Sequence, residues 1–217
     1  MSTLNVDKVD PSTGTTLELG TSGDTVNLGS GVTAGTGFGG DLSFGGDTFG
    51  ANKVIGANDA YSLSLETSGN TALTIDANGI ITKPLQPAFS AYASAGQAGV
   101  SGTTWIVGAF NTEVFDINAD YDTTTYTFTA PVTGKYLFTA MFTVDNFTGR
   151  PYSMFYTSNR NYTISWFGNN LSGGENSFAG SNIVDMDASD TCLFQIYAYD
   201  DTAFDLGCYY FTGALLC

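Results

Sequence analysis

The most constraining feature of the sequence is a run in which aromatic residues alternate with other residues, TYTFTAPVTGKYLFTAMF over residues 125–142. Tyr126 and Phe128 occupy every second position before the turn residues Pro131 and Gly134, and the alternation resumes after them. A period of two places the rings on one face of a strand. The run therefore predicts two strands joined by a hairpin turn, with their rings in the core of a two-sheet sandwich.

Composition extends this prediction to the whole chain. The 217 residues include 27 Gly, 16 Phe and 12 Tyr, but only 6 Lys and Arg together. Aromatic residues and Thr favour strands, whereas helices usually draw on Lys, Glu, Arg and Leu. We therefore expect an all-β protein.

The charge balance excludes several classes of function. The formal net charge is −15 without a basic cluster, which excludes a groove for nucleic-acid phosphates. The absence of His removes His-based triads and most transition-metal sites. No apolar run reaches the roughly 20 residues that cross a bilayer, and the first residues lack the apolar region of a secretory signal. The sequence thus predicts a soluble protein made in a cytoplasm, with neither nucleic-acid binding nor membrane insertion.

The three cysteines are Cys192, Cys208 and Cys217. Their number is odd, and none has metal-ligand spacing such as C-x-x-C. We expect buried free thiols and no disulfide framework.

The chain has two unlike parts, divided near Pro84 and Pro87. Of the 30 aromatic residues (16 Phe, 12 Tyr and 2 Trp), 26 lie from Ala88 onward, whereas 15 of the 27 Gly lie before it. Proline fixes φ and removes a backbone donor, as expected of a short stiff connector. The sequence predicts a domain boundary at this point.

The Gly-rich part predicts an elongated β shaft over residues 16–86. TLELGTSGD and TVNLGSGVT repeat paired apolar residues at a spacing of nine, and residues 63–82 predict three short strands with Gly-marked turns. Strands this short cannot form a core alone, so stacked copies or identical chains would complete it. A calcium-binding nonapeptide β-roll and a disordered Gly/Ser linker are the alternatives.

The second part carries a spaced set of residues that resembles a known family. Its members are Phe110, Asp116, Tyr121, Phe128, Gly134, Tyr136 and Phe138. The spacing resembles the signature of the complement-1q-type globular head, in the tumour necrosis factor superfamily of jelly rolls. PAFSAY (87–92), SDTCLFQIYA (189–198) and YYFTGALL (209–216) resemble further strands of that family. The resemblance covers residues 87–217 and implies an antiparallel jelly-roll β-sandwich with these aromatic residues in its core.

The resemblance also implies assembly, because heads of this superfamily form homotrimers. The first residues, MSTLNVDKVDPSTGT, resemble the N-termini of fibre proteins of tailed bacteriophages. We therefore predict a virion fibre: an attachment segment over 1–15, a trimeric shaft over 16–86 and a head over 87–217. Leu4 and Val6 alternate with polar residues, which predicts a short strand that adds to the sheet edge of another virion protein.

Receptor binding is predicted for residues 146–178, interpreted as exposed loops of the head. Aromatic residues and Arg beside Asn and Ser are typical of adaptable binding surfaces. The candidates are Arg150, Tyr152, Tyr156, Arg160, Tyr162 and Trp166. The partner would be a host surface glycan or protein, and the two Arg favour anionic sugars.

Three carboxylate clusters are candidate calcium ligands, although solvated turn residues explain them better. They are Asp116, Asp120 and Asp122; Asp185, Asp187 and Asp190; and Asp200, Asp201 and Asp205. No nucleophile stands beside a base in the sequence, so we expect no enzyme activity and no cofactor.

Two other functions fit the same sequence. One is a capsid decoration protein whose head stabilises the particle without recognising a receptor. The other is a secreted, ligand-like jelly roll, against which the missing secretory signal argues.

Overall fold

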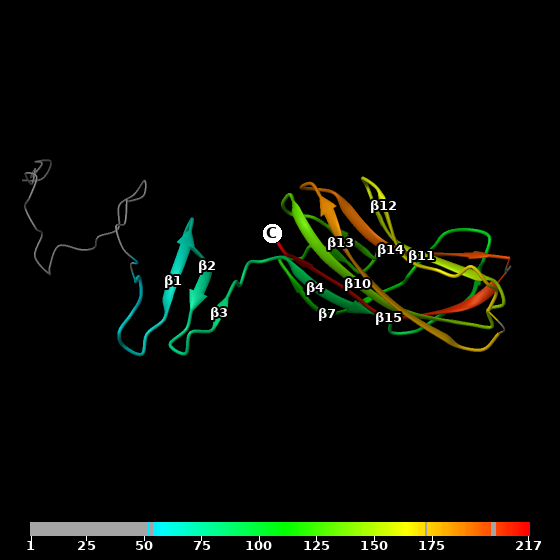
Figure 1. The fold of residues 1–217 in the computed structure, drawn as a ribbon, viewed down its shortest axis with the longest axis horizontal. Coiled ribbons are helices and arrows are strands. Elements are labelled where there is room, and N and C mark those ends of the chain that lie inside the picture. Colours follow the sequence, from blue (N-terminus) through cyan, green and yellow to red (C-terminus); the bar gives the residue numbers. More distant parts are fainter. Residues whose placement is uncertain (1–51, 53, 172, 201–202) are drawn as a thin grey trace, which may run out of the picture. The chain divides into compact units, whose positions relative to one another are not determined.

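The computed structural model describes residues 52, 54–171, 173–200 and 203–217, and within them the chain forms strands and no helix (Figure 1). The strands are β1 (Leu63–Thr67), β2 (Asn70–Ile75), β3 (Ile81–Thr82), β4 (Ala88–Tyr92), β5 (Gln97–Ser101), β6 (Ile106–Val107), β7 (Thr112–Ile117), β8 (Tyr121–Asp122), β9 (Thr127–Thr129), β10 (Gly134–Asp145), β11 (Arg150–Thr157), β12 (Asn161–Trp166), β13 (Asn176–Met186), β14 (Thr191–Tyr199) and β15 (Ala203–Leu215). The all-β prediction is therefore confirmed. None of the described residues belongs to a helix that could span a membrane. The attachment segment with Leu4 and Val6 and the nine-residue repeat lie outside the described residues.

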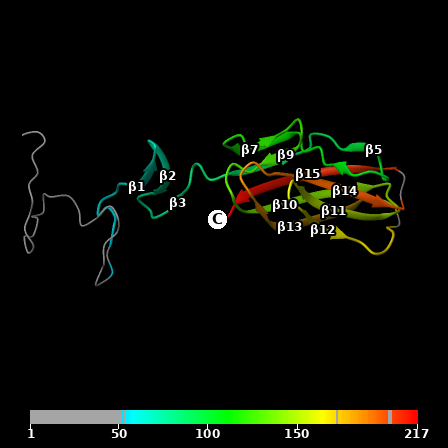
Figure 2. The same cartoon turned by 90° about the horizontal axis from the view of Figure 1, so that it is seen from above.

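The C-terminal part is an antiparallel jelly-roll sandwich of two sheets, as predicted, and its strands can be followed from two directions in Figures 1 and 2. The first sheet has the strand order β13-β10-β15-β4-β7, and β5 also pairs with β15. The second sheet has the order β12-β11-β14-β9-β8, and β6 also pairs with β14. Neighbours that are distant in sequence, such as β4 and β15, are typical of this topology.

Strand β10 shows why the sequence produces such a sandwich. Tyr136, Phe138, Ala140 and Phe142 are fully buried, whereas Leu137 between them is 39% exposed. Because successive side chains of a strand point to opposite faces, the alternation gives one face to the core and the other to the outer surface. Strand β14 alternates in the same way from the opposite sheet.

Aromatic rings from both sheets fill the space between them. Phe89 of β4 stacks on Phe128 of β9 with ring centroids 5.2 Å apart. Phe128 also lies 5.4 Å from Tyr136 and 5.4 Å from Phe138, both on β10. Since β4 and β10 belong to the first sheet and β9 to the second, these stacked and edge-on ring contacts hold the two sheets together.

The predicted hairpin around Pro131 and Gly134 is wrong. Strand β9 pairs with β8 and β14, whereas β10 pairs with β13 and β15, so the connection crosses from one sheet to the other. The backbone N–H of Ala130 donates to Asp190 instead, at 2.8 Å. Tyr126 lies in the preceding turn with φ 58° and not in the strand. The alternation of residues defined which way the rings point, but it did not define the partner strand.

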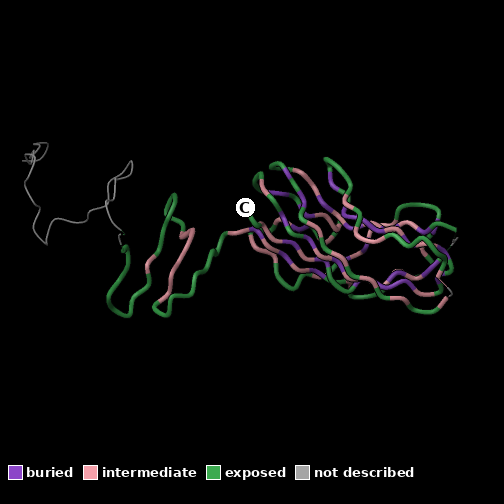
Figure 3. Tube along the Cα trace, in the orientation of Figure 1, coloured by how far each residue is buried: buried purple, intermediate pink, exposed green. Residues whose placement is uncertain are grey.

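Strands β1 to β3 form a separate three-stranded antiparallel sheet, at the positions that the sequence predicts for three short strands. Its second turn is held by Asp76, whose Oδ1 accepts hydrogen bonds from the N–H groups of Asn78 and Ile80, both at 2.8 Å. No described residue before Pro87 is buried (Figure 3). This sheet therefore has no core of its own.

Candidate interaction surface

The rings of the spaced set lie in the core of the head. Phe110, Tyr121, Phe128, Tyr136 and Phe138 are each at most 4% exposed. The Tyr121 hydroxyl donates to the Phe110 carbonyl at 2.9 Å, and the Tyr136 hydroxyl donates to the Val132 carbonyl at 2.7 Å. Burial raises the pKa of both phenols, which keeps them protonated as donors. These residues hold the fold together and present no surface to a ligand.

Asp116, which belongs to the same spaced set, organises a turn. Its Oδ1 accepts from the N–H of Asp120 at 3.2 Å, and its Oδ2 accepts from the N–H of Tyr121 at 2.9 Å. The turn includes Asn118 and Ala119, with φ of 73° and 57°. Left-handed residues are strained unless their surroundings fix them, so the Asp116 carboxylate compensates this strain.

Gly134 is required by a close approach of the C-terminal segment. A Cβ atom at this position would lie 2.5 Å from the Cys217 carbonyl oxygen and 2.7 Å from Cδ1 of Leu215. The N–H of Lys135 donates to that Cys217 carbonyl at 2.7 Å. Any side chain at residue 134 would therefore separate β10 from the end of the chain.

Described carboxylates of all three clusters take part in turns and loop contacts. Asp122 accepts from the hydroxyl and N–H of Thr124 and from the hydroxyl of Thr125, and these bonds lower the pKa of its carboxyl to about 2. Asp205 accepts from the Gly99 N–H at 2.7 Å and from Nδ2 of Asn146 at 2.8 Å. Among the residues that the structure describes, no group of three or more His, Cys, Asp or Glu could hold a metal ion. Asp201 lies outside the described residues.

Asp120 differs from the other acidic residues because it is half-buried and lacks a partner at one oxygen. Its Oδ2 is buried without a hydrogen bond. Burial raises the pKa of this carboxyl, and the neighbouring charge of Asp116 adds to the rise.

The cysteines are free within the described chain, as expected. Cys192 and Cys208 are buried, and burial raises the pKa of both thiols, that of Cys208 to about 12. Cys217 is exposed, which contradicts the expectation that all three are buried. Its carbonyl accepts from the N–H of Lys135 on β10.

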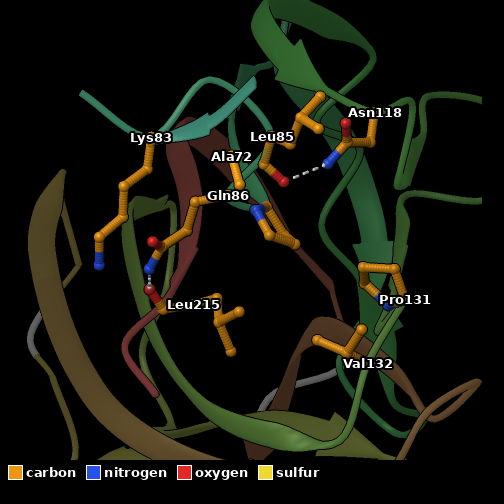
Figure 4. A pocket seen from close by; sticks show the side chains of 9 residues that line it. Ala72, Lys83, Leu85, Gln86, Asn118, Pro131, Val132 and Leu215 are labelled. Atoms are coloured by element: carbon orange, nitrogen blue, oxygen red, sulfur yellow. Dashed lines mark hydrogen bonds between the residues drawn. The ribbon is translucent and has the colours of Figure 1, made fainter. Parts of the chain in front are cut away.

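A cavity of about 450 Å³ lies where the connector enters the head (Figure 4). Its lining is largely apolar: Ala72, Lys83, Leu85, Gln86, Pro87, Asn118, Pro131, Val132 and Leu215. Gln86 Nε2 donates to the Leu215 carbonyl at 2.6 Å, and Asn118 Nδ2 donates to the Leu85 carbonyl at 3.0 Å. These bonds attach the connector to the head. The lining contains no nucleophile beside an acid or base, so its geometry does not support catalysis.

The prediction that residues 146–178 are loops is wrong for most of them. Strands β11 and β12 and the start of β13 occupy this segment, and β11 lies in the middle of the second sheet between β12 and β14. Asn and Ser residues suggested loops, but several of them lie on paired strands. The hydroxyls of Ser153 and Ser165, for example, are 2.6 Å apart. Of the described residues in this segment, only those around 146–149, 158–160, 167–171 and 173–175 remain outside strands.

Three of the predicted receptor residues share the outer face of the second sheet. Arg150 and Tyr152 are on β11, and Trp166 is opposite Tyr152 on β12. The rings of Tyr152 and Trp166 have centroids 5.7 Å apart. Trp166 is 70% exposed. This pair begins a longer row of rings that continues across the sheet.

The row continues with three residues that sequence analysis did not identify. Trp105 precedes β6 and lies 5.4 Å from the Tyr152 ring and 5.4 Å from the Tyr197 ring. Tyr197 and Tyr199 of β14 have centroids 4.7 Å apart. We call Trp105, Tyr152, Trp166, Tyr197 and Tyr199 the aromatic face. The available signal was the alternation in β14, in which Tyr197 and Tyr199 occupy the positions opposite to the buried Ile196 and Ala198.

Arg150 borders the aromatic face and is already paired. Its Nε donates to Oδ2 of Asp200 at 2.7 Å, and its second guanidinium nitrogen is also 2.7 Å from that oxygen. The guanidinium lies over the Tyr199 ring, 5.6 Å from the centroid. The Arg150 guanidinium is engaged by both contacts. This geometry therefore does not support the expectation that Arg150 binds anionic sugars.

The other three candidates lie apart from the aromatic face. Tyr156 is 45% exposed near the far end of β11. Arg160 is exposed in the turn between β11 and β12, 5.9 Å from the Tyr162 ring. Tyr162 packs against the core, and its hydroxyl accepts from the N–H of Asp185 at 3.0 Å. The six residues predicted from the sequence are therefore not one site.

The family of the chain follows from a match to a family model. The family model of the C1q domain matches residues 88–216. The globular domain of zebrafish complement 1qA is a similar solved structure, with 20% identity over 61% of this chain and 98% of that chain and a TM-score of 0.48. Murine APRIL at pH 5.0 has 12% identity over 60% of this chain and 99% of that chain, with a TM-score of 0.46. The PRD1 vertex protein P5 has 14% identity over 61% of this chain and 99% of that chain, with a TM-score of 0.42. No curated protein sequence matches the chain. The match to the family model spans more than half of the residues, and the chain therefore belongs to the C1q-domain family.

Proposed function

We propose that the chain is the subunit of a homotrimeric virion fibre or spike whose C1q head contacts the host surface. Residues 1–15 attach it to another virion protein, and residues 16–86 form the shaft. Domains of this family are generally ligand-binding or structural modules and not enzymes, and they typically form homotrimers. The resemblance of the first residues to phage fibre N-termini supports the virion location.

The observation that carries the proposal is the sheet β1 to β3, which has no buried residue. Leu65 of β1 is 60% exposed and Ile81 of β3 59%, and Tyr61, two residues before β1, is 75% exposed. A small sheet that buries so little is not stable by itself in water, because folding costs conformational entropy that only burial offsets. Identical chains around one axis would cover these apolar side chains and complete the core of a shaft.

The head has an outer surface suited to the same three-fold contact. Leu137 of β10 is opposite Ile183 of β13, and Met141 is opposite Tyr210 of β15. Leu137 is 39% exposed, Ile183 54% and Tyr210 53%. We call Leu137, Met141, Ile183 and Tyr210 the trimer face. Burying apolar area of this kind at about 25 cal/mol per Å² stabilises an interface between subunits.

The oligomeric state is the first test. Light scattering on the purified chain is expected to give three times the subunit mass of 22.8 kDa, because both the shaft sheet and the trimer face need neighbouring copies. A folded monomer at this mass would contradict the proposal. A dimer would contradict it equally, since two chains cannot surround a three-fold shaft.

Attachment to the particle is the second test. A chain that lacks residues 2–14 is expected to trimerise and melt like the parent, because the head and the shaft strands remain. It should be absent from assembled particles, since its edge-pairing strand with Leu4 and Val6 is gone. Immunoblots of purified particles measure this, with the full-length chain as the control. Normal incorporation of the truncated chain would show that these residues do not attach the fibre.

A further inference from the structure

The aromatic face is an exposed surface that the fold does not need. Trp105 is 39% exposed, Tyr199 42% and Trp166 70%, although each touches another ring of the row. The inner face of the same sheet already supplies the core, through buried residues such as Phe155 and Phe194. Exposed aromatic residues gathered in one patch typically mark an interaction site.

The aromatic face lies on the opposite sheet from the trimer face. The aromatic face is on β11, β12, β14 and the segment before β6, whereas the trimer face is on β10, β13 and β15. Subunits that associate through the first sheet leave the outer face of the second sheet accessible. Three aromatic faces would then be exposed on each head.

The chemistry of the patch favours an uncharged ligand. Its neighbouring cation, Arg150, is paired with Asp200 and stacked on Tyr199. The chain has a net charge of −15, which repels polyanions over distances of a Debye length. The patch also contains polar groups between its rings: the Tyr152 hydroxyl lies 2.9 Å from Oγ1 of Thr163. Rings combined with hydroxyls suit a ligand that has apolar faces and hydroxyl edges.

We propose that the aromatic face binds a neutral polysaccharide of the host surface, which names the ligand class for the proposed host contact and rests on that function. The C–H groups on one face of a pyranose ring carry a weak positive charge and pack against the negative face of an aromatic ring. Trp166, the most exposed ring, stacks on the sugar, and Trp105 continues the platform across β14. Each site is shallow and weak, and three sites on one head act together through avidity.

Tryptophan fluorescence reports directly on this proposal, because the only two Trp of the sequence, Trp105 and Trp166, are both on the aromatic face. The full-length protein is titrated with four neutral polysaccharides (dextran, laminarin, galactan and mannan) and with dextran sulfate. At least one neutral polymer is expected to shift the tryptophan emission. Dextran sulfate is expected to leave the emission unchanged. The variant Trp166→Ala should weaken that binding about tenfold or more, the loss typical of a hot spot, as measured by calorimetry.

The matched control is Tyr156→Ala, which removes a ring of the head that is 45% exposed and lies apart from the aromatic face. It should bind the neutral polymer like the parent. The proposal is overturned if none of the four neutral polymers binds, if only dextran sulfate binds, or if Trp166→Ala binds a neutral polymer as tightly as the parent. Thermal melting of Trp166→Ala is expected to match the parent, because this side chain is largely solvated.

Adsorption of particles that carry Trp166→Ala separates this inference from the proposed function. Loss of polysaccharide binding together with loss of adsorption supports both. Loss of polysaccharide binding with normal adsorption keeps the glycan site but removes its role in host contact. Reduced adsorption without binding of any neutral polymer overturns the glycan inference and leaves host contact by the head in place.

Discussion

Replacing Phe128 by alanine is expected to destabilise the head by about 3–5 kcal/mol, the usual cost of removing a buried ring. Phe128 is 1% exposed and contacts the rings of Phe89, Tyr136 and Phe138 from the other sheet. The variant therefore loses apolar burial and leaves a cavity between the sheets. A loss of this size is a large share of the roughly 5–15 kcal/mol that stabilises a typical domain.

Chemical denaturation monitored by circular dichroism measures this effect. Tyr156→Ala is the matched control, because Tyr156 is an aromatic residue of the same sheet that is 45% exposed. Its free energy of unfolding should change by less than about 1 kcal/mol. If Phe128→Ala unfolds at the same denaturant concentration as this control, the ring contacts between the sheets do not stabilise the head.

The second large effect is expected at the trimer face. The double variant Leu137→Asp and Ile183→Asp places two carboxylates on paired residues of β10 and β13. Each subunit would bring these charges into the same interface, where desolvation and mutual repulsion oppose association. The trimer should dissociate on dilution at concentrations about a thousandfold higher than the parent, equivalent to about 8 kcal/mol per trimer, because the dissociation constant of a trimer varies as the square of the concentration.

Molar mass measured over a dilution series tests this prediction. Tyr156→Asp is the control, since it adds a carboxylate at an exposed ring on the second sheet, away from the trimer face. It should dissociate like the parent. A double variant that stays trimeric down to the same concentration as the parent would show that the outer face of the first sheet is not the subunit contact.

The sequence by itself determined the fold class and the family of the head. Strict alternation in strands such as β10 and β14 defines which side chains are buried, because the two faces of a strand differ by one residue. The spaced set from Phe110 to Phe138 identified the family, since those residues occupy core, turn and close-packed positions that other residue types do not fill. The three short strands of residues 63–82 were also predictable, because Gly69 and Gly79 mark their two turns and Asp76 holds the second.

Only the tertiary structure decided which strands are partners. The sequence around Pro131 and Gly134 predicts a hairpin, but this segment crosses from one sheet to the other. The N–H of Ala130 donates to Asp190 in the turn before β14, and β10 pairs with β13 and β15. Alternation is a local property of one strand, whereas pairing depends on contacts between residues far apart in the chain.

The same distinction explains the candidate site. Composition marked residues 146–178 as a binding region, yet Tyr162 turns into the core and Arg150 is neutralised by Asp200. The aromatic face instead combines Trp105, a pair of residues from β11 and β12, and another pair from β14. Tyr152, Tyr197 and Tyr199 alternate with buried neighbours along their strands, whereas Trp105 and Trp166 have no buried neighbour in the chain. Their meeting on one surface depends on strand register, which long-range backbone pairing alone establishes.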